Sequence, residues 1–374
     1  MQTVHNILNL GIKELRSLLR DPMLLVLVVL AFTVMVYAAA TAAPETLHKA
    51  TIAIVDEDRS QLSQSIVNTF YPPYFMPPVM ITQSEVDRGM NTGRYTFALN
   101  IPSSFQRDVL SGRSPEIQLS VDATQMQQAF TGSGHIQAIV IGEVTDFVQR
   151  HHAATSLLVD LALRARFNPA LNPSWFMGLM ELINLITMLS IILTGAALLR
   201  EREHGTIEHL MVMPVTPFEI MVAKVWSMAL VVLVAASFSL IFIVKGLLSV
   251  PIEGSILLFL AGATLHLFAT TSMGIFLATF ARSMPQFGML LILVIIPLQI
   301  LSGGMTPRES MPELVQTLML GAPSTHFVII GQAILYRGAG LSVVWPQFIA
   351  LVLIGTSFFA VSLARFRKTL SAMA

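Results

Sequence analysis

The feature that most constrains this chain is a set of six apolar stretches, each long enough to cross a lipid bilayer. A helix that crosses about 30 Å of hydrocarbon needs about 20 apolar residues, because a shorter run leaves charge or unpaired backbone groups in lipid. The composition agrees, since 54% of the residues are hydrophobic and only 12% are charged. We therefore predict an α-helical integral membrane protein with six transmembrane helices, at residues 23–43, 182–199, 225–244, 254–281, 283–305 and 346–364.

Basic residues near the ends of these stretches predict the orientation, because cytoplasmic loops hold an excess of Lys and Arg. With the amino terminus inside, the inner side collects Lys13, Arg16, Arg20, Arg200, Arg202, Lys224, Arg282, Arg365, Arg367 and Lys368. The short outer loops carry fewer, namely Lys245, Arg308 and Arg337. We therefore expect both termini, including the tail 365–374, to be cytoplasmic.

Residues 1–22 have the spacing of an amphipathic helix. Apolar side chains such as Ile12 and Leu15 line one face, while Lys13, Glu14 and Arg16 occupy the rest. Such a helix lies on the membrane surface. The alternative is a secretory signal, because an Ala-rich segment ends the first apolar stretch, although that stretch is longer than a typical signal core.

Residues 44–175, between the first and second stretches, have the composition of a soluble domain. Residues 51–55, 95–101 and 117–121 predict strands, helices are expected at 60–70 and 103–110, and a helical pattern covers 124–167. We expect an inserted α/β domain that faces the periplasm, followed by helices two to six within residues 176–364. Asp56 and Asp58 could bind a cation, but helix capping accounts for them without a metal.

The segment 200–217 is far more charged than its apolar surroundings. It opens with Arg200, Glu201, Arg202 and Glu203, continues through Gly205 and Glu208, and ends with Pro214 and Pro217. Its apolar residues form a stripe, which favours a short amphipathic helix along the cytoplasmic surface. A polar connector between two spans is the alternative.

Four segments, taken in order, resemble the permeases of type-2 ABC exporters. They are residues 53–63 (AIVDEDRSQLS), 95–112 (YTFALNIPSSFQRDVLSG), the charged segment 200–217, and 325–338 (THFVIIGQAILYRG). The resemblance implies a Gram-negative inner-membrane permease of the multidrug type, in which residues 200–217 form a coupling helix against a cytoplasmic ATP-binding subunit. This chain has no G-x-x-x-x-G-K-[ST] loop, so ATP and Mg are expected on that partner.

The resemblance also implies a pair of permeases, either two copies or one copy with a paralogue. It implies efflux of hydrophobic or amphiphilic compounds, with a periplasmic adaptor as a further candidate partner. Nucleic acid is not expected, because 22 basic residues balance 22 acidic ones. We expect no catalytic, cofactor-binding or metal-binding residue in this chain.

The region 306–345 is too polar to cross the membrane, and helical patterns occur at 311–320 and 327–336. In the family that it resembles, this region dips back into the outer leaflet. Prolines and glycines are tolerable at that depth only where protein or water covers the backbone. A gate that includes Thr325, His326 and Gly338 is one interpretation, and an ordinary outer loop is the other.

A secondary, ion-coupled transporter is the alternative function. Such a protein would need an acid or a histidine within a span, because intramembrane charge is costly and is retained for use. Glu181 and His266 are the candidates. For His266, a neutral imidazole that is hydrogen-bonded to a neighbouring side chain is the structural explanation.

Overall fold

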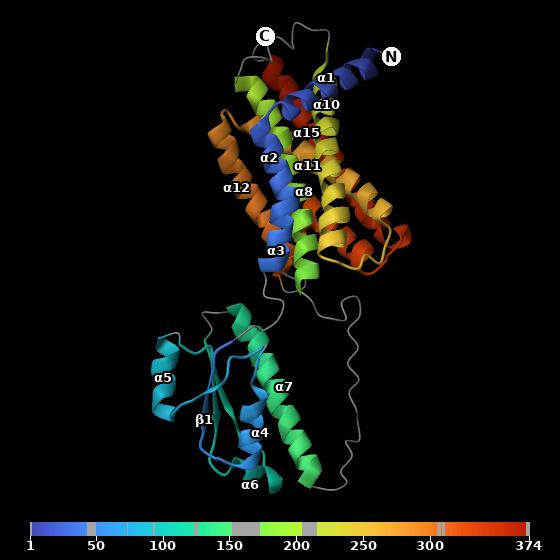
Figure 1. The fold of residues 1–374 in the computed structure, drawn as a ribbon. Helices are drawn as coiled ribbons and strands as arrows, with labels where there is room; N and C mark the ends of the chain where they lie inside the picture. The colour runs from blue at the N-terminus through green and yellow to red at the C-terminus, as the bar shows by residue number, and fades with distance from the viewer. Residues whose placement is uncertain are drawn as a thin grey trace. The chain divides into compact units, whose positions relative to one another are not determined.

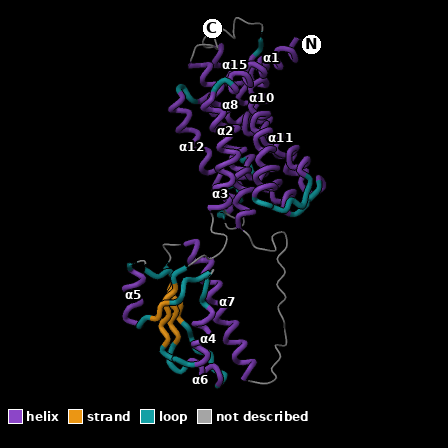
Figure 2. The backbone as a smooth tube through the Cα atoms, in the orientation of Figure 1, coloured by secondary structure: helices purple, strands orange, loops and turns teal. Residues whose placement is uncertain are grey.

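The computed structural model describes residues 2–42, 50–72, 74–92, 94–122, 126–151, 173–203, 215–304, 308 and 311–371. Its contacts divide the chain into two units, Met1–Ala43 with Arg166–Ala374, and Pro44–Ala165. The first unit is a helix bundle and the second is an α/β domain, as Figures 1 and 2 show.

Within the described residues, six helices of the bundle are long and apolar enough to cross a membrane. The first is built from α2 (Pro22–Leu30), the π-helix η1 (Ala31–Met35) and α3 (Val36–Ala42). The others are α8 (Pro173–Glu203), α10 (Pro217–Phe238) continued by η3 (Ser239–Leu247), α11 (Ile256–Phe280), α12 (Met284–Leu301) and α15 (Leu341–Ser371). These correspond in order to the six predicted stretches, so the predicted fold class is confirmed.

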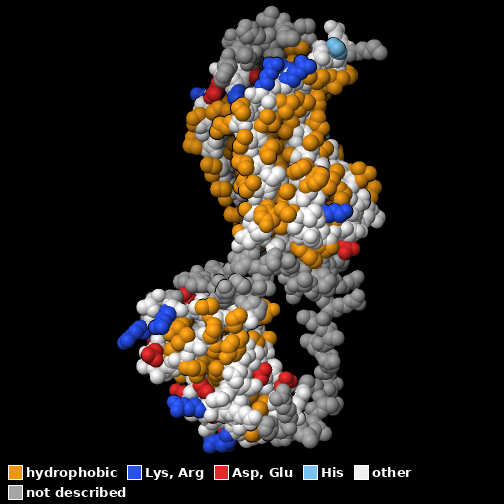
Figure 3. All heavy atoms as spheres, viewed as in Figure 1, with side chains coloured by type: hydrophobic (Ala, Val, Ile, Leu, Met, Phe, Trp, Pro, Cys, Tyr) orange, Lys and Arg blue, Asp and Glu red, His pale blue; other side chains and the backbone are white. Residues whose placement is uncertain are grey.

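Helices α8 and α11 form the centre of the bundle. At Gly274 of α11, a Cβ atom would lie 2.5 Å from the carbonyl oxygen of Ile191 in α8, so glycine is what lets the two backbones touch. By contrast, α12 and α15 expose large apolar side chains, with Leu293 70% and Leu353 62% exposed. Figure 3 shows apolar side chains along the visible face of the bundle.

The spans alternate in direction, and both chain termini lie at the same end of the bundle (Figure 1). Helix α1 (Gln2–Leu19) packs there against α10. Lys and Arg side chains gather at this end in Figure 3, from α1, the carboxyl end of α8 and neighbouring elements. We call it the basic end, and the other the opposite end.

A broken helix pair enters the bundle from the opposite end. Helix α13 (Glu313–Met319) is followed by α14 (Pro323–Gly331) and the π-helix η5 (Gln332–Tyr336), with a bend of 89° at the break. Phe327 of α14 is fully buried, and its ring stacks on His266 in α11 at a centroid separation of 4.2 Å. The start of α14 therefore reaches the middle of a spanning helix.

In the α/β unit the strand order is β2-β1-β3-β4. The strands are β1 (Ile52–Asp56), β2 (Val79–Met80), β3 (Phe97–Ile101) and β4 (Gln118–Val121); β1 runs parallel to β2 and β3, and β4 is antiparallel to β3. Helices α4 (Gln61–Thr69), α6 (Phe105–Leu110) and α7 (Met126–His151) cover one face, and α5 (Gln83–Asn91) covers the other.

The structure of this unit contains two elements that the sequence did not predict, and part of one predicted helix cannot be compared with it. Strand β2 and helix α5 are not predicted from the sequence, and the part of the 124–167 pattern beyond His151 lies outside the described residues. Asp56 accepts hydrogen bonds from the backbone of Asp58 and from Ser63, at 3.1 and 2.8 Å, and Asp58 accepts one from the Gln106 backbone at 3.0 Å. Local turn and cap contacts thus occupy these carboxylates.

Candidate functional site

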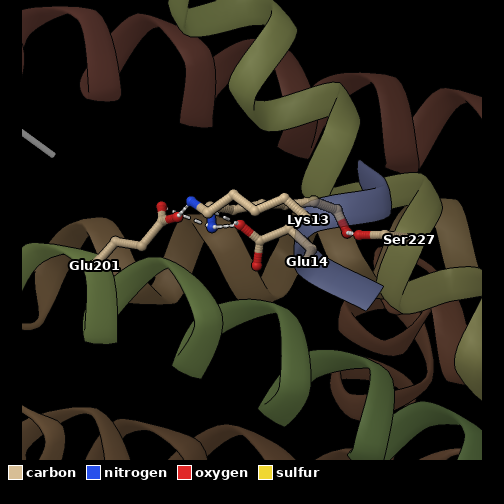
Figure 4. Close-up of polar contacts among 5 residues, drawn as sticks. Lys13, Glu14, Glu201 and Ser227 are labelled. Carbon is tan, nitrogen blue, oxygen red and sulfur yellow. Dashed lines mark hydrogen bonds and ion pairs between the residues drawn. The ribbon is translucent and has the colours of Figure 1, made fainter. Parts of the chain in front are cut away.

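Four charged side chains meet where α1 crosses the ends of α8 and α10 (Figure 4). The Nζ atom of Lys224, in α10, lies 2.9 Å from Oε1 of Glu14 and 2.7 Å from Oε2 of Glu201. Lys13 Nζ lies 2.9 Å from the other oxygen of Glu201. We call Lys13, Glu14, Glu201 and Lys224 the charge cluster. It joins α1, α8 and α10 through side chains rather than through the backbone.

The burial of the charge cluster affects the pKa values of its members. The Lys224 side chain is only 1% exposed, and a buried ammonium group costs several kcal/mol unless carboxylates surround it. Burial raises the pKa of the Glu14 carboxyl; the ammonium of Lys224 opposes this rise and the neighbouring Glu201 carboxylate adds to it. For Lys13, burial lowers the pKa, but its contacts with Glu201 outweigh burial and leave the pKa raised. Each charge therefore depends on the others.

The end of α8 contacts five other elements through four consecutive residues. Arg200 donates to Asp21, the N-cap of α2, at 3.0 Å, and Glu201 joins the charge cluster. Arg202 donates to the carbonyl of Ala281, the C-cap of α11, at 3.1 Å. Glu203 accepts from the backbone of Met284, the first residue of α12, at 2.7 Å. Successive side chains on a helix point about 100° apart, so this run covers the whole circumference of α8.

A second contact ties α1 to α10. The indole Nε1 of Trp226 donates to the carbonyl of Ile7 at 3.3 Å. A Cβ at Gly11 would overlap the Trp226 ring, so the indole packs directly on the backbone of α1. The amphipathic helix is thus fixed at the basic end by packing as well as by charge.

The structure corrects the expected bounds of the segment 200–217. Arg200, Glu201, Arg202 and Glu203 are the last turn of the spanning helix α8, because the helical backbone continues past the apolar stretch. Pro217 is the first residue of α10, and the preceding Thr216 caps that helix through Glu219. The other predicted coupling residues, Gly205, Glu208 and Pro214, lie outside the described residues.

Of the charge cluster, sequence reasoning predicted only Glu201 as a site residue and placed Lys13 on the polar face of α1. It placed Glu14 on the polar face of α1, yet that residue is only 8% exposed, because Lys224 lies beneath it. The sequence places Lys224 among the basic residues of the inner side, next to the border of a span, with no predicted partner. Its position immediately before an apolar stretch was the one available signal, since its partner Glu14 is 210 residues away.

The residues of the predicted gate do not form one group. Thr325 and His326 are buried at the start of α14, where the His326 ring lies 2.9 Å from the carbonyl of Leu320 across the break. Gly338 follows the end of η5, near the opposite end of the bundle. The two parts are separated by the length of α14 and η5.

The intramembrane candidates lie in helices at the centre of the bundle. His266 Nε2 lies 2.8 Å from the hydroxyl of Thr187, and Ser190 donates to Thr270 beside them at 2.6 Å. The contact with Thr187 is the kind of hydrogen bond to a neighbouring side chain that we expect of a histidine with a structural role. Glu181 lies in α8, at the end far from the charge cluster.

Six helices long enough to span a membrane, a bent helix pair, an amphipathic helix fixed at the basic end and an inserted α/β unit define a multi-span membrane protein. The chain belongs to the ABC-2 family of transporter proteins, whose family model matches residues 22–364. It is 63% identical to the inner membrane transport permease YhhJ of Escherichia coli (strain K12) over 374 residues, which cover 100% of both chains.

More distant relatives agree with this family. The chain is 27% identical over 370 residues to the probable multidrug ABC transporter permease YbhR of Escherichia coli (strain K12), covering 97% of this chain and 99% of the relative. It is 24% identical over 338 residues to the probable multidrug permease YbhS of the same organism, covering 88% of each. The expected ABC transporter permease is confirmed, and it replaces the ion-coupled alternative.

Proposed function

We propose that this chain is the membrane-spanning subunit of an exporter, in which a separate cytoplasmic subunit binds ATP and Mg and drives efflux of hydrophobic or amphiphilic compounds. Membership of the ABC-2 family supports an ATP-binding partner. The multidrug names of two relatives support the class of cargo. In this proposal the basic end and both termini face the cytoplasm, and the α/β unit faces the periplasm.

The run Arg200 to Glu203 is the observation that carries the coupling role. It lies immediately before the segment that we assign to the ATPase contact, and its side chains contact α2, the charge cluster, α11 and α12. A displacement of this end of α8 would therefore be transmitted to several spans together. Binding energy from the partner can then shift the bundle between two arrangements.

The remaining partners are part of the same proposal. A second permease, either another copy or a paralogue, completes the membrane half, and a periplasmic adaptor is a further candidate. The re-entrant helix, with Thr325 and His326 at its deep end, would act as the gate on the outer side.

Purification tests the partnership. The tagged chain is purified in mild detergent from its native host, and bound proteins are identified by mass spectrometry. A stoichiometric subunit with a phosphate-binding loop is expected. A chain that is recovered without any ATPase, under conditions that preserve other transporter complexes, would contradict the proposal.

Charge reversal tests the coupling. Glu208→Lys, in the charged segment, should abolish ATP-dependent accumulation of a fluorescent hydrophobic dye in inverted vesicles, while the amount of folded complex is retained. Glu253→Lys is the matched control, because Glu253 is an exposed acid at the opposite end. Normal transport by the Glu208 variant would sink the coupling assignment.

A further inference from the structure

A cavity of about 600 Å³ lies at the opposite end of the bundle. Its wall is formed by the start of α8, the residues that follow α12, and one face of α14 and η5. This volume is within the range of small-ligand sites in proteins. The cavity is far from the charge cluster and plays no part in the proposed coupling.

Two arginines, Arg308 and Arg337, are among the residues that line this cavity. No carboxylate lines it among the residues that the structure describes. Arginine presents a planar set of donors that matches the oxygens of a phosphate or carboxylate. The charge of the wall therefore selects an anion.

Two residues of the wall each carry a buried polar atom that has no hydrogen-bond partner among the described residues. These atoms are Nε of Arg308 and Oγ1 of Thr325, whose residue is only 1% exposed. The terminal nitrogen of Arg308 reaches the Gln316 carbonyl only at 3.5 Å. Unsatisfied buried donors cost free energy, and a ligand oxygen that reached them would supply the missing acceptors.

The rest of the wall is partly apolar. Thr325, Val328, Ile329 and Gln332 recur at helical spacing and so share one face of α14 and η5, with Phe176 of α8 also in the wall. Hydrocarbon can therefore lie against Val328 and Phe176 while polar atoms meet the arginines. A wall of this kind suits a ligand with a charged head and an apolar body.

We propose that this cavity binds the anionic headgroup of an amphiphile, with a phosphate or carboxylate between Arg308 and Arg337. Binding requires neither nucleotide nor the ATPase. That the bound amphiphile is cargo, rather than a resident lipid, rests on the proposed function.

The test uses the full-length chain in neutral maltoside detergent, labelled at its tag, with binding followed by thermophoresis. The probes are dodecyl phosphate and dodecylphosphocholine, which share a tail and differ in net charge. Dodecyl phosphate should bind at least about tenfold more tightly, as expected for a charge-assisted hydrogen bond. Inorganic phosphate, added as competitor, distinguishes a free anion from a headgroup: displacement supports a site for the anion itself, and retention supports a site that also needs the tail.

Variants locate the site. Arg337→Gln should weaken binding of dodecyl phosphate about tenfold, because Arg337 is exposed and its loss should not disturb folding. Lys245→Gln removes an exposed charge at the same end outside the cavity wall and should bind as the unmodified chain does. Arg308→Gln should weaken binding in the same direction.

Equal binding of the two probes, or equal loss in the Arg337 and Lys245 variants, would overturn the proposal. ATP-dependent export of dodecyl phosphate by the complete complex would identify it as cargo. Binding without export would leave the site in place as one for a resident amphiphile and would count only against the transport role.

Discussion

Replacing Lys224 by Met tests whether the charge cluster holds the basic end together. The substitution keeps the length of the side chain but removes a buried ammonium that lies 2.9 Å from Glu14 and 2.7 Å from Glu201. Removing one partner of a buried ion pair costs about 3–5 kcal/mol, since the remaining charge is left buried and unpaired. Glu14 can respond by binding a proton, because burial already raises its pKa. We therefore expect the lower part of this range, about 3 kcal/mol.

Thermal unfolding of the purified chain in detergent measures this loss. A destabilisation of about 3 kcal/mol should lower the Tm by roughly 6–12 °C for a unit of this size. Hydrogen exchange should also rise in α1, which loses its anchor to α10. The combined variant Glu14→Gln, Glu201→Gln, Lys224→Met should recover most of the Tm, because the one charge that remains, on Lys13, is on a side chain that is 51% exposed.

Lys245→Met is the control, because this lysine is exposed and lies at the opposite end. Its Tm should match that of the unmodified chain. The reasoning fails if Lys224→Met unfolds at the same temperature as Lys245→Met, or if the combined variant is less stable than Lys224→Met alone.

Three further predictions follow from described contacts. Gly274→Leu should destabilise the bundle by about 1–3 kcal/mol in detergent melts, because its Cβ would press on a carbonyl of α8, whereas Gly288→Ala, with open space around it, should not. Asp21→Ala should speed hydrogen exchange in the first turn of α2, by loss of a cap worth about 1 kcal/mol, and Asp21→Asn should retain most of that protection. In α5, hydrogen bonds from Thr82 lower the pKa of Glu85, so its contribution is present above pH 4.5 and is lost as pH falls through the lowered pKa. Glu85→Gln should remove this acid-dependent rise in exchange, and an unchanged pH profile would contradict it.

The spans could be predicted because bilayer thickness fixes how long an apolar stretch must be. Their ends could not, because α8 extends at both ends beyond its apolar stretch, from Pro173 to Glu203. A helix can continue through charged residues wherever each finds a partner, as the Arg200 to Glu203 run does. Hydropathy therefore located the centre of α8 and missed its terminal turn.

Other features depend on contacts between distant parts of the chain. The burial of Glu14 follows from Lys224, and neither residue alone predicts the pair. Strand β2 is only two residues long, too short to show a period, and α5 is only nine residues long and largely polar. The cavity with Arg308 and Arg337 exists only after α14 packs against the residues that follow α12.

The run at the end of α8 has a consequence for how this helix can change in length. Gly195 packs against the ring of Phe287, and Arg200 to Glu203 contact five elements a little more than one turn later. Inserting one residue between them would rotate the whole run by about 100° and assign every side chain to the wrong neighbour. A substitution in this interval affects the contacts of one residue, whereas a single insertion or deletion disrupts the contacts of Arg200, Glu201, Arg202 and Glu203 together. The number of residues between Gly195 and Arg200, which sets the rotation of the end of α8 about its axis, is therefore constrained more tightly than the identity of any one residue in this helix.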